Sequence, residues 1–549
     1  GLFSGTYSIG ILKSTDNGNN WQATNFFSLE QGILIYELLV HPENENQVWA
    51  ATNKGILYTE NGGDNWNYLI ENQIFTTIKM HTQNAEILFS TTFDWNGNTA
   101  VLRSNDSGKN WSEILKFDSI NRIKIEIDAK YPNNLLLLGS SVDKSDMGVC
   151  LKSYDLGNNW TDITNSLNDA VYGQGFYNLV LFNDPKSDSS FFTGGINLSY
   201  YDSKTKQNFF QNGTHVDFHS LVFNQHDSTY YCGNDGGIYK NRSPKTDKWV
   251  NISYGLGITQ VYRATPNPFF NDNILIGSQD NGIIEFKDNL WFNRLSADGM
   301  ECVYDNYLPE LYYYSAQNAK IHKSNSNYFN KINEINEKKP WLTHYQAHPQ
   351  NQGQIYFGLE NLYIYDNNSD TLVQLSNFQS KNTIVHFEVY DKNPNYIYVI
   401  TESDLFKTTD SGLNWNKIDS PFQNMTSISI NPKNPEHIFL TNASYFDTLK
   451  VMEYNNGNWI NHSNGLLNLP INKILIPKTN PDFLIIATDL GIYAKNIDDL
   501  EWFEYGSGLP NVIVNDIKIN YSNGFLYAGT WGRGVWKAKL WNCENQKIL

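Results

Sequence analysis

The stretch "STDNGNNW" (Ser14–Trp21) ends a polar turn on a tryptophan, and the chain repeats this pattern. Further copies end at Trp66, Trp111, Trp160 and Trp415, and all fit Ser/Thr-x-Asp/Asn-x-Gly-x-x-Trp. The hydroxyl, and the carboxylate or amide two residues later, can bond nearby backbone groups and close a compact loop. The glycine supplies a positive φ, and the tryptophan is expected to bury its ring beneath the turn. We therefore interpret these aspartates as structural rather than as catalytic acids.

The turn recurs at a nearly constant interval. The first four tryptophans are 45, 45 and 49 residues apart, and weaker copies follow at Trp249, Trp291, Trp459 and Trp502. A fixed period of this length is typical of a solenoid or a propeller. Between the turns, short β-branched and aromatic segments alternate with Pro, Asn and Gly, as in "ISINPKNPEHIFLTN" (428–442). Such segments are typical of strands, and four antiparallel strands per repeat make a propeller blade.

The repeats predict an all-β fold of tandem β-propellers with almost no helix. We expect about 13–14 four-stranded blades, and two seven-bladed rings, because one propeller holds about four to eight blades. The first propeller is expected over residues 1–256, with an incomplete N-terminal blade, and the second over residues 257–549. Because the chain starts inside a repeat, its beginning is interpreted as processed or trimmed.

The charge, hydropathy and cysteine content of the chain exclude several classes of partner and site. The net charge of −17 argues against nucleic acid and against an anionic membrane surface. No run of 18 apolar residues is present, so no membrane insertion is expected. The cysteines are too few and too scattered for a disulfide framework or a zinc knuckle; they are Cys150, Cys232, Cys302 and Cys543.

The repeated turns resemble the Asp-box (BNR) repeats of sialidases, sortilins and glycoside hydrolase family 74, over the whole chain. "GNDGGIYKN" (233–241), "GITQVYRATPNP" (257–268) and "GSQDNGIIEF" (277–286) further resemble secreted, family-74-like bacterial surface proteins. The resemblance implies propeller blades and a secreted or cell-surface location. It implies little about activity, because the Asp-box lies on the turn opposite the usual active face.

In such blades, the turn between the second and third strands opens on that active face. These turns and the adjacent strand ends carry amides, carboxylates and rings, which suit stacking and hydrogen bonding to a neutral sugar. The candidate ligand-binding residues are Phe93, Trp95, Asp235, Gln279, Asp280, Asp298, Glu301, Trp531 and Arg533. The carboxylates of residues 235–301 are expected to share a cleft near the junction of the rings. The alternative is that the carboxylates cap turns and the rings pack between blades.

The run "HVDFH" offers a candidate metal site. On a strand, His215, Asp217 and His219 would point to one face. The run reads equally well as the entry to a strand, and no fourth ligand is apparent. We expect no cofactor, apart from a possible structural cation.

Catalysis meets stricter requirements. A sialidase needs an arginine cluster, which this chain lacks. Family 74 inverts with two aspartates, and the resemblance places its base in a motif that corresponds here to "TYSIGILK" (6–13). Tyr7 stands where the base should be, and a phenol cannot replace that carboxylate. Asp235 and Asp298 remain the candidate catalytic residues.

These observations favour a secreted or cell-surface module that binds a glycan or a protein; its partner would be a polysaccharide or a surface protein. One alternative is a family-74-like hydrolase that acts within β-glucans such as xyloglucan. Another is a structural spacer in a larger surface protein.

Overall fold

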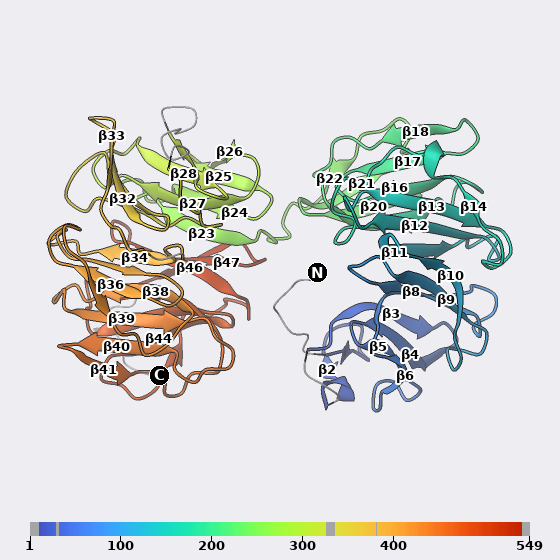
Figure 1. The fold of residues 1–549 in the computed structure, drawn as a ribbon, viewed down its shortest axis with the longest axis horizontal. Coiled ribbons are helices and arrows are strands. Elements are labelled where there is room, and N and C mark those ends of the chain that lie inside the picture. Colours follow the sequence, from blue (N-terminus) through green and yellow to red (C-terminus); the bar gives the residue numbers. More distant parts are fainter. Residues whose placement is uncertain (1–9, 29–31, 325–334, 380–381, 541–549) are drawn as a thin grey trace. The chain divides into compact units, whose positions relative to one another are not determined.

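The computed structural model describes residues 10–28, 32–324, 335–379 and 382–540, and divides the chain into two compact units (Figure 1). The first unit is Gly1–Tyr254 and the second is Gly255–Leu549; the division expected from the sequence was after residue 256. The described residues contain 48 strands and two short 3₁₀ helices, η1 (Asn25–Ser28) and η2 (Thr164–Ser166). The predicted all-β propeller fold is confirmed. Neither helix is long and apolar enough to cross a membrane.

The described part of the first unit contains six successive groups of antiparallel strands, of which the third and fourth are joined into one sheet by the pairing of Arg122 with Phe93. The first is a hairpin of β1 (Leu12–Lys13) and β2 (Gln22–Ala23). The second group is β3 (Ile35–His41), β4 (Asn44–Thr52), β5 (Gly55–Thr59) and β6 (Asn67–Glu71). The third is β7 (Ile74–Met80), β8 (Leu88–Phe93), β9 (Thr99–Ser104) and β10 (Ser112–Phe117). The fourth is β11 (Ile120–Ile127), β12 (Leu135–Ser141), β13 (Met147–Ser153) and β14 (Thr161–Asp162). The fifth is β15 (Val180–Asn183), β16 (Phe191–Gly194), β17 (Leu198–Asp202) and β18 (Gln207–Phe210). The sixth is β19 (Phe218–Asn224), β20 (Thr229–Asn234), β21 (Gly237–Asn241) and β22 (Val250–Asn251).

The second unit contains seven groups. They begin with β23 (Val261–Pro266), β24 (Ile274–Ser278), β25 (Gly282–Lys287) and β26 (Leu290–Leu295), and continue with β27 (Gly299–Tyr304), β28 (Tyr312–Ala316) and β29 (Lys320–Lys323). The third group is β30 (Tyr345–Ala347), β31 (Gln354–Gly358), β32 (Leu362–Asp366) and β33 (Thr371–Gln374). The fourth is β34 (His386–Val389), β35 (Ile397–Ile400), β36 (Leu405–Thr408) and β37 (Asn416–Ile418). The fifth is β38 (Met425–Ile430), β39 (His437–Asn442), β40 (Val451–Asn455) and β41 (Asn458–Asn461). The sixth is β42 (Ile471–Leu475), β43 (Phe483–Thr488), β44 (Gly491–Asn496) and β45 (Phe503–Glu504), and the seventh is β46 (Val514–Asn520), β47 (Phe525–Thr530) and β48 (Val535–Lys539).

The first strands of the second unit form a closed ring. β27 contacts β23 and β30, and β38 contacts β34 and β42. The side-chain amide of Gln346, in β30, makes two hydrogen bonds with the backbone of Val389, in β34: it donates to Val389 O and accepts from Val389 N. β46 contacts both β42 and β23, which closes the circle. The prediction of seven blades therefore holds for this unit, whereas the described part of the first unit has six.

Side chains rather than a shared sheet join the last blade of the second unit to its first. Asn515 Nδ2 donates to Val261 O at 3.0 Å, and Asp516 Oδ2 accepts from Ala264 N at 3.1 Å. Within the described residues, the only β-pairing between the two ends of the unit is the isolated bridge of Gln260 with Trp531.

The core lies between neighbouring blades. Every residue of β8 and of β43 is buried, because both faces of these second strands are covered. The outer strand β26 is exposed along most of its length. Cys150, Cys232 and Cys302 are free and buried in this core.

The repeated turn has the hydrogen bonds that the sequence predicts. Ser104 Oγ donates to Asp106 Oδ1 and accepts from Gly108 N, both at 2.8 Å. Asp106 also accepts from the backbone and side chain of Asn110, which lowers the pKa of Asp106 to about 2. The same bonds recur in the turns that end at Trp21, Trp160 and Trp415.

The tryptophans of these turns differ in burial. Trp66 is 5% exposed, and its ring meets that of Phe26, in the preceding repeat, edge to face at 5.3 Å. Trp21 is 60% exposed, so the expectation of a buried ring is wrong for the first copy. Trp111, Trp160 and Trp415 are partly buried, so the burial of the ring differs from copy to copy of the turn.

Candidate functional site

An exposed tryptophan marks the turn between β8 and β9 in the first unit. Phe93 is buried at the end of β8, whereas Trp95 is 46% exposed. The two rings meet edge to face at 4.8 Å, so Phe93 supports Trp95 from below. Asp94 Oδ1 accepts from Asn96 N at 2.7 Å, and Gly97 turns the chain with a φ of 89°. The sequence "TFDWNGN" thus presents one ring on a tight turn.

A second ring comes from the segment between η2 and β15. Phe176 lies 5.7 Å from Trp95, centroid to centroid, and its neighbour Tyr177 is 37% exposed. Arg122 Nη1 donates to Phe176 O at 3.2 Å and also to Tyr177 O. Burial lowers the pKa of Arg122 to about 10, which leaves its guanidinium charged at neutral pH. This arginine fixes the backbone that carries both rings.

His219 connects these aromatic rings to a carboxylate, that of Asp235, on the turn between β20 and β21. The ring of Tyr177 meets the imidazole of His219 edge to face at 5.2 Å. His219 Nε2 lies 2.8 Å from Asp235 Oδ1. The turn is tight at Gly236, where an added Cβ would lie 2.3 Å from His215 Cβ. We call Trp95, Phe176, Tyr177, His219 and Asp235 the aromatic strip.

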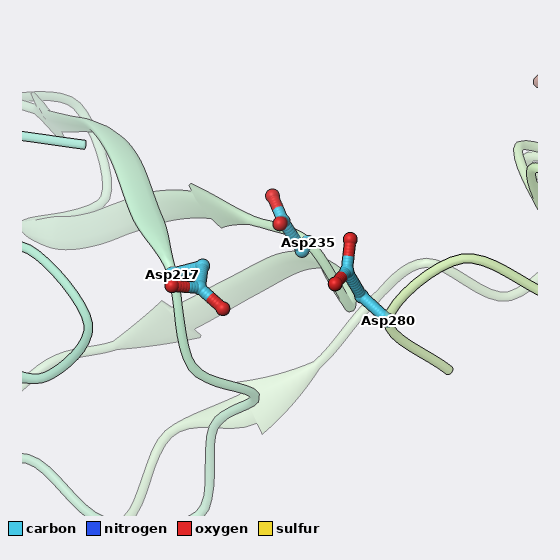
Figure 2. Close-up of side chains that lie close together, drawn as sticks. All are labelled: Asp217, Asp235 and Asp280. Atoms are coloured by element: carbon cyan, nitrogen blue, oxygen red, sulfur yellow. The ribbon is translucent and has the colours of Figure 1, made fainter. Parts of the chain in front are cut away.

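Asp217 lies beside Asp235. Asn178 Nδ2 donates to Asp217 Oδ1 at 2.8 Å, and burial, followed by the charge of Asp235, raises the pKa of Asp217. Carboxylate oxygens of Asp217 and Asp235 lie within 4.8 Å of each other (Figure 2). Asp280, also labelled there, belongs to the second unit and is described with it.

The geometry assumed for the predicted metal site does not hold. β19 begins only at Phe218, and Asp217 has a φ of 64°, so the alternation expected of a strand does not apply to His215, Asp217 and His219. His215 Nδ1 lies 3.1 Å from the carbonyl of Val216, and His219 faces Asp235. In the first unit, Asp217 and Asp235 are the carboxylates best placed to hold a cation together.

In the second unit, three predicted ligand-binding residues bond within or beside their own turn. Asp298 is 9% exposed, and its Oδ1 accepts from Asp280 N at 2.9 Å. Gln279 Oε1 accepts from the hydroxyl of Tyr262. The carboxylate of Asp298 therefore caps a turn, the structural alternative considered for these residues.

Trp531 and Arg533 lie on the turn between β47 and β48. The Trp531 ring meets that of Tyr262 at 5.0 Å, and Trp341, which is 50% exposed, donates from Nε1 to the Tyr262 hydroxyl at 3.4 Å. Arg533 Nη1 donates to Gly532 O at 3.1 Å. The second unit thus has its own group of rings, around Tyr262.

Glu301 lies inside the second ring. It is 1% exposed and accepts from Arg263 Nε at 3.0 Å and from Lys518 Nζ at 2.9 Å, with His344 Nδ1 at 3.2 Å. Burial alone would oppose its ionisation, but Lys518, His344 and Arg263 together hold the pKa of Glu301 well below its usual value. Its carboxylate therefore joins blades of the second unit through its basic partners.

The sequence analysis missed Arg122, Phe176, Tyr177 and Asn178. The run "GQGFYN" (173–178) contains adjacent aromatic residues directly after two glycines and outside any strand, a signal that could have been noticed. Tyr7, which stands at the position of the family-74 base, lies outside the described residues.

Comparisons with known proteins support the fold. No protein-family model matches the chain, and no curated protein matches it in sequence. A family 74 enzyme from Niastella koreensis has a similar structure, with a TM-score of 0.66 and 14% identity, covering 96% of this chain and 86% of that one. The family 74 xyloglucanase of Xanthomonas campestris is similar with a TM-score of 0.64 and 12% identity, over 91% of this chain and 82% of that one. A third similar structure is PorZ, a surface component of the type-IX secretion system of Porphyromonas gingivalis. Its TM-score is 0.51 and its identity 12%, over 91% of this chain and 73% of that one. At such identities, the similarity establishes a family-74-like propeller fold.

Proposed function

We propose that this chain is a secreted or cell-surface module that binds a neutral polysaccharide, and that the aromatic strip of the first unit is its binding surface. The observation that carries the proposal is the unbroken series of contacts from Trp95 through Phe176 and Tyr177 to His219 and Asp235. Trp95, the pair Phe176–Tyr177, and the pair His219 and Asp235 come from three separate segments of the chain, which only the folded unit brings together.

The chemistry of the strip suits a sugar chain. Exposed rings offer flat apolar surfaces for the C–H faces of pyranose rings, and burial of such rings contributes strongly to binding. The carboxylates of Asp217 and Asp235 and the imidazole of His219 can bond hydroxyl groups at the edge of the same surface. The net charge of −17 favours a neutral glycan over an acidic one.

Binding to a glycan array, followed by titration of the best glycan, tests the proposal. We expect Trp95→Ala and Tyr177→Ala each to weaken binding by about ten-fold or more, by analogy with the about 1–3 kcal/mol that an aromatic side chain contributes when a nucleobase stacks on it. Trp21→Ala is the matched control, because Trp21 is also exposed but lies on a repeated turn. Equal losses for Trp21→Ala and Trp95→Ala, or no glycan bound at all, would contradict the proposal.

The second candidate is hydrolysis of a β-glucan, which the structural similarity to two family 74 enzymes favours. An inverting pair of carboxyl groups stands about 6.5–9.5 Å apart to admit a water. Asp217 and Asp235 each offer one oxygen within 4.8 Å of the other, so their nearest atoms are closer than that separation. Reducing ends released from xyloglucan, and lost in Asp235→Ala or Asp298→Ala, would establish the hydrolase instead.

We further infer that the repeated turns are Asp-boxes, as in sortilins and sialidases. Their shared hydrogen bonds and glycine conformations support this inference. A surface protein as partner, or a role as spacer, would be indicated by an array on which no glycan binds.

A further inference from the structure

A cavity of about 520 Å³ lies in the second unit, where the first strands of three consecutive blades end. Its walls come from β34 and β38 and from the segments that follow β34, β38 and β42. Successive turns of a blade alternate between its two ends, so this cavity opens on the side away from the turn that carries Gln279 and Asp280. Its volume is within the range of about 300–1,000 Å³ typical of small-molecule sites.

The cavity has an apolar side and a polar side. Ile430 and Ile476 line it together with Pro432 and Pro481. Glu388 and Asp391 provide the carboxyl groups, and Lys392, Lys433 and Lys478 provide the cations. Such a lining fits a ligand with an apolar body and one charged end.

Glu388 differs from its counterpart in the first unit. Glu388 Oε2 accepts from Ile430 N, in the next blade, at 3.1 Å. Glu37, on β3, makes the same bond to Ile78 N at 2.8 Å, but its other oxygen pairs with Lys79 at 2.9 Å. Among the described ion pairs none includes Glu388, which lines the cavity instead. Each glutamate thus accepts a hydrogen bond from a backbone N–H of the next blade. Of the two, only Glu37 also has a cation paired with its second oxygen.

The surroundings of Glu388 favour its protonated form. Burial, followed by the charge of Asp391, raises its pKa to about 8, although Lys473 of β42, the bond from Ile430 and Lys478 oppose this shift. Asp391 Oδ2 pairs with Lys478, so that lysine is already engaged by another carboxylate. A protonated carboxyl is a hydrogen-bond donor, and its neutrality leaves three lysines around the cavity against Asp391 of the lining and Asp482, the partner of Lys433.

We propose that this cavity binds a small organic acid, whose carboxylate accepts a hydrogen bond from the Glu388 carboxyl while its apolar part packs against Ile430 and Ile476. Lys392, Lys433 and Lys478 lie around the cavity; Lys478 pairs with Asp391 and Lys433 with Asp482. The site is independent of the aromatic strip and of any glycan bound there.

Benzoate and its neutral isostere benzamide are suitable probes, in titrations of the full chain followed by ligand-observed NMR. Benzoate should bind more tightly than benzamide at pH 6.5, and its affinity should fall at least ten-fold by pH 9.5 as Glu388 ionises. Glu388→Gln keeps a donor that cannot ionise, so its affinity for benzoate should be the same at both pH values. Glu388→Leu should lose at least ten-fold at pH 6.5.

Glu37→Gln is the matched control, since Glu37 has the same place in a blade of the first unit and lines no part of this cavity. It should bind benzoate as the unaltered chain does. Lys473 also titrates in this interval, because burial lowers its pKa to about 8. A pH dependence that persists in Glu388→Gln would assign the effect to such a group and overturn the proposal. Absence of benzoate binding, or equal affinity at both pH values in the unaltered chain, would overturn it as well.

Discussion

Lys518 donates to Glu301 Oε1 at 2.9 Å and so connects the last blade of the second unit to its second blade. The same amine donates to Thr265 Oγ1, in the first blade, at 2.7 Å. One lysine thus contacts two blades at the place where the ring closes. Because Glu301 is buried, it depends on such partners to remain ionised inside the protein.

Lys518→Met should lower the free energy of unfolding of the second unit by about 1.5–3 kcal/mol, the usual contribution of a hydrogen bond to a charged group. Arg263 and His344 remain beside Glu301 and limit the loss. Denaturant unfolding measures the effect. Lys433→Met is the control, since its pair with Asp482 is exposed and should contribute at most about 1 kcal/mol. Equal effects of the two substitutions would contradict the assignment.

Acid should destabilise the second unit in two stages. Burial lowers the pKa of His344 to about 4, below its usual value near 6.5, so the unfolded chain takes up a proton here before the folded one does. Stability from this histidine is present above about pH 6.5 and is lost as the pH falls toward 4. Glu301, whose pKa is also lowered, adds a further loss at lower pH.

His344→Gln isolates the first stage, because glutamine can still donate to Glu301 but does not titrate. Unfolding free energies measured from pH 7 to pH 4 should fall more steeply in the unaltered chain, by on the order of 2–3 kcal/mol over the interval. Parallel curves for the two proteins would show that another group causes the acid sensitivity.

The repeated turns should differ in their contribution to stability. Trp66→Ala removes a ring that is 5% exposed and packed on Phe26, and should cost about 3–5 kcal/mol. Trp21→Ala, in the same motif, removes a ring that is 60% exposed and should cost less than about 1 kcal/mol. Thermal melting of the two variants checks this order, and a larger loss for Trp21→Ala would refute it.

Arg122 should affect glycan binding indirectly, by holding the backbone that carries two rings of the aromatic strip. Arg122→Met removes the donor to the carbonyls of Phe176 and Tyr177 without removing a ring. We expect several-fold weaker binding, because the two rings would no longer be held in place. Arg103→Met is a fair control, since Arg103 likewise donates to a backbone carbonyl, that of Leu156, in another part of the unit. If both variants bound glycan equally well, Arg122 would have no positioning role.

The fold could be predicted because the motif is local. Ser104, Asp106 and Gly108 make their bonds within five residues, so sequence spacing alone contains the geometry. Burial of Trp66 or Trp21 depends instead on the neighbouring repeat, which spacing does not specify.

The candidate site was harder to predict. Phe176 and Tyr177 lie in no strand and in no repeated motif, and only the folded unit places them beside Trp95 and His219. The prediction for His215, Asp217 and His219 assumed extended backbone, whereas Asp217 adopts a positive φ. Glu301 has the chemistry of a ligand-binding residue, but its position in the ring gives it three basic neighbours.

The junction of β46 with β23 has a mechanical consequence. Between other successive blades of the second unit, the chain itself crosses the interface. Here the two blades are joined without a covalent connection, through side chains such as Asn515 and Asp516, the bridge of Gln260 with Trp531, and backbone hydrogen bonds from Gly532 and Gly534 to Thr259 O. A force that pulls on the two ends of this unit therefore acts directly on that seam. The ring should tear there first, while the six remaining interfaces still carry their covalent connections.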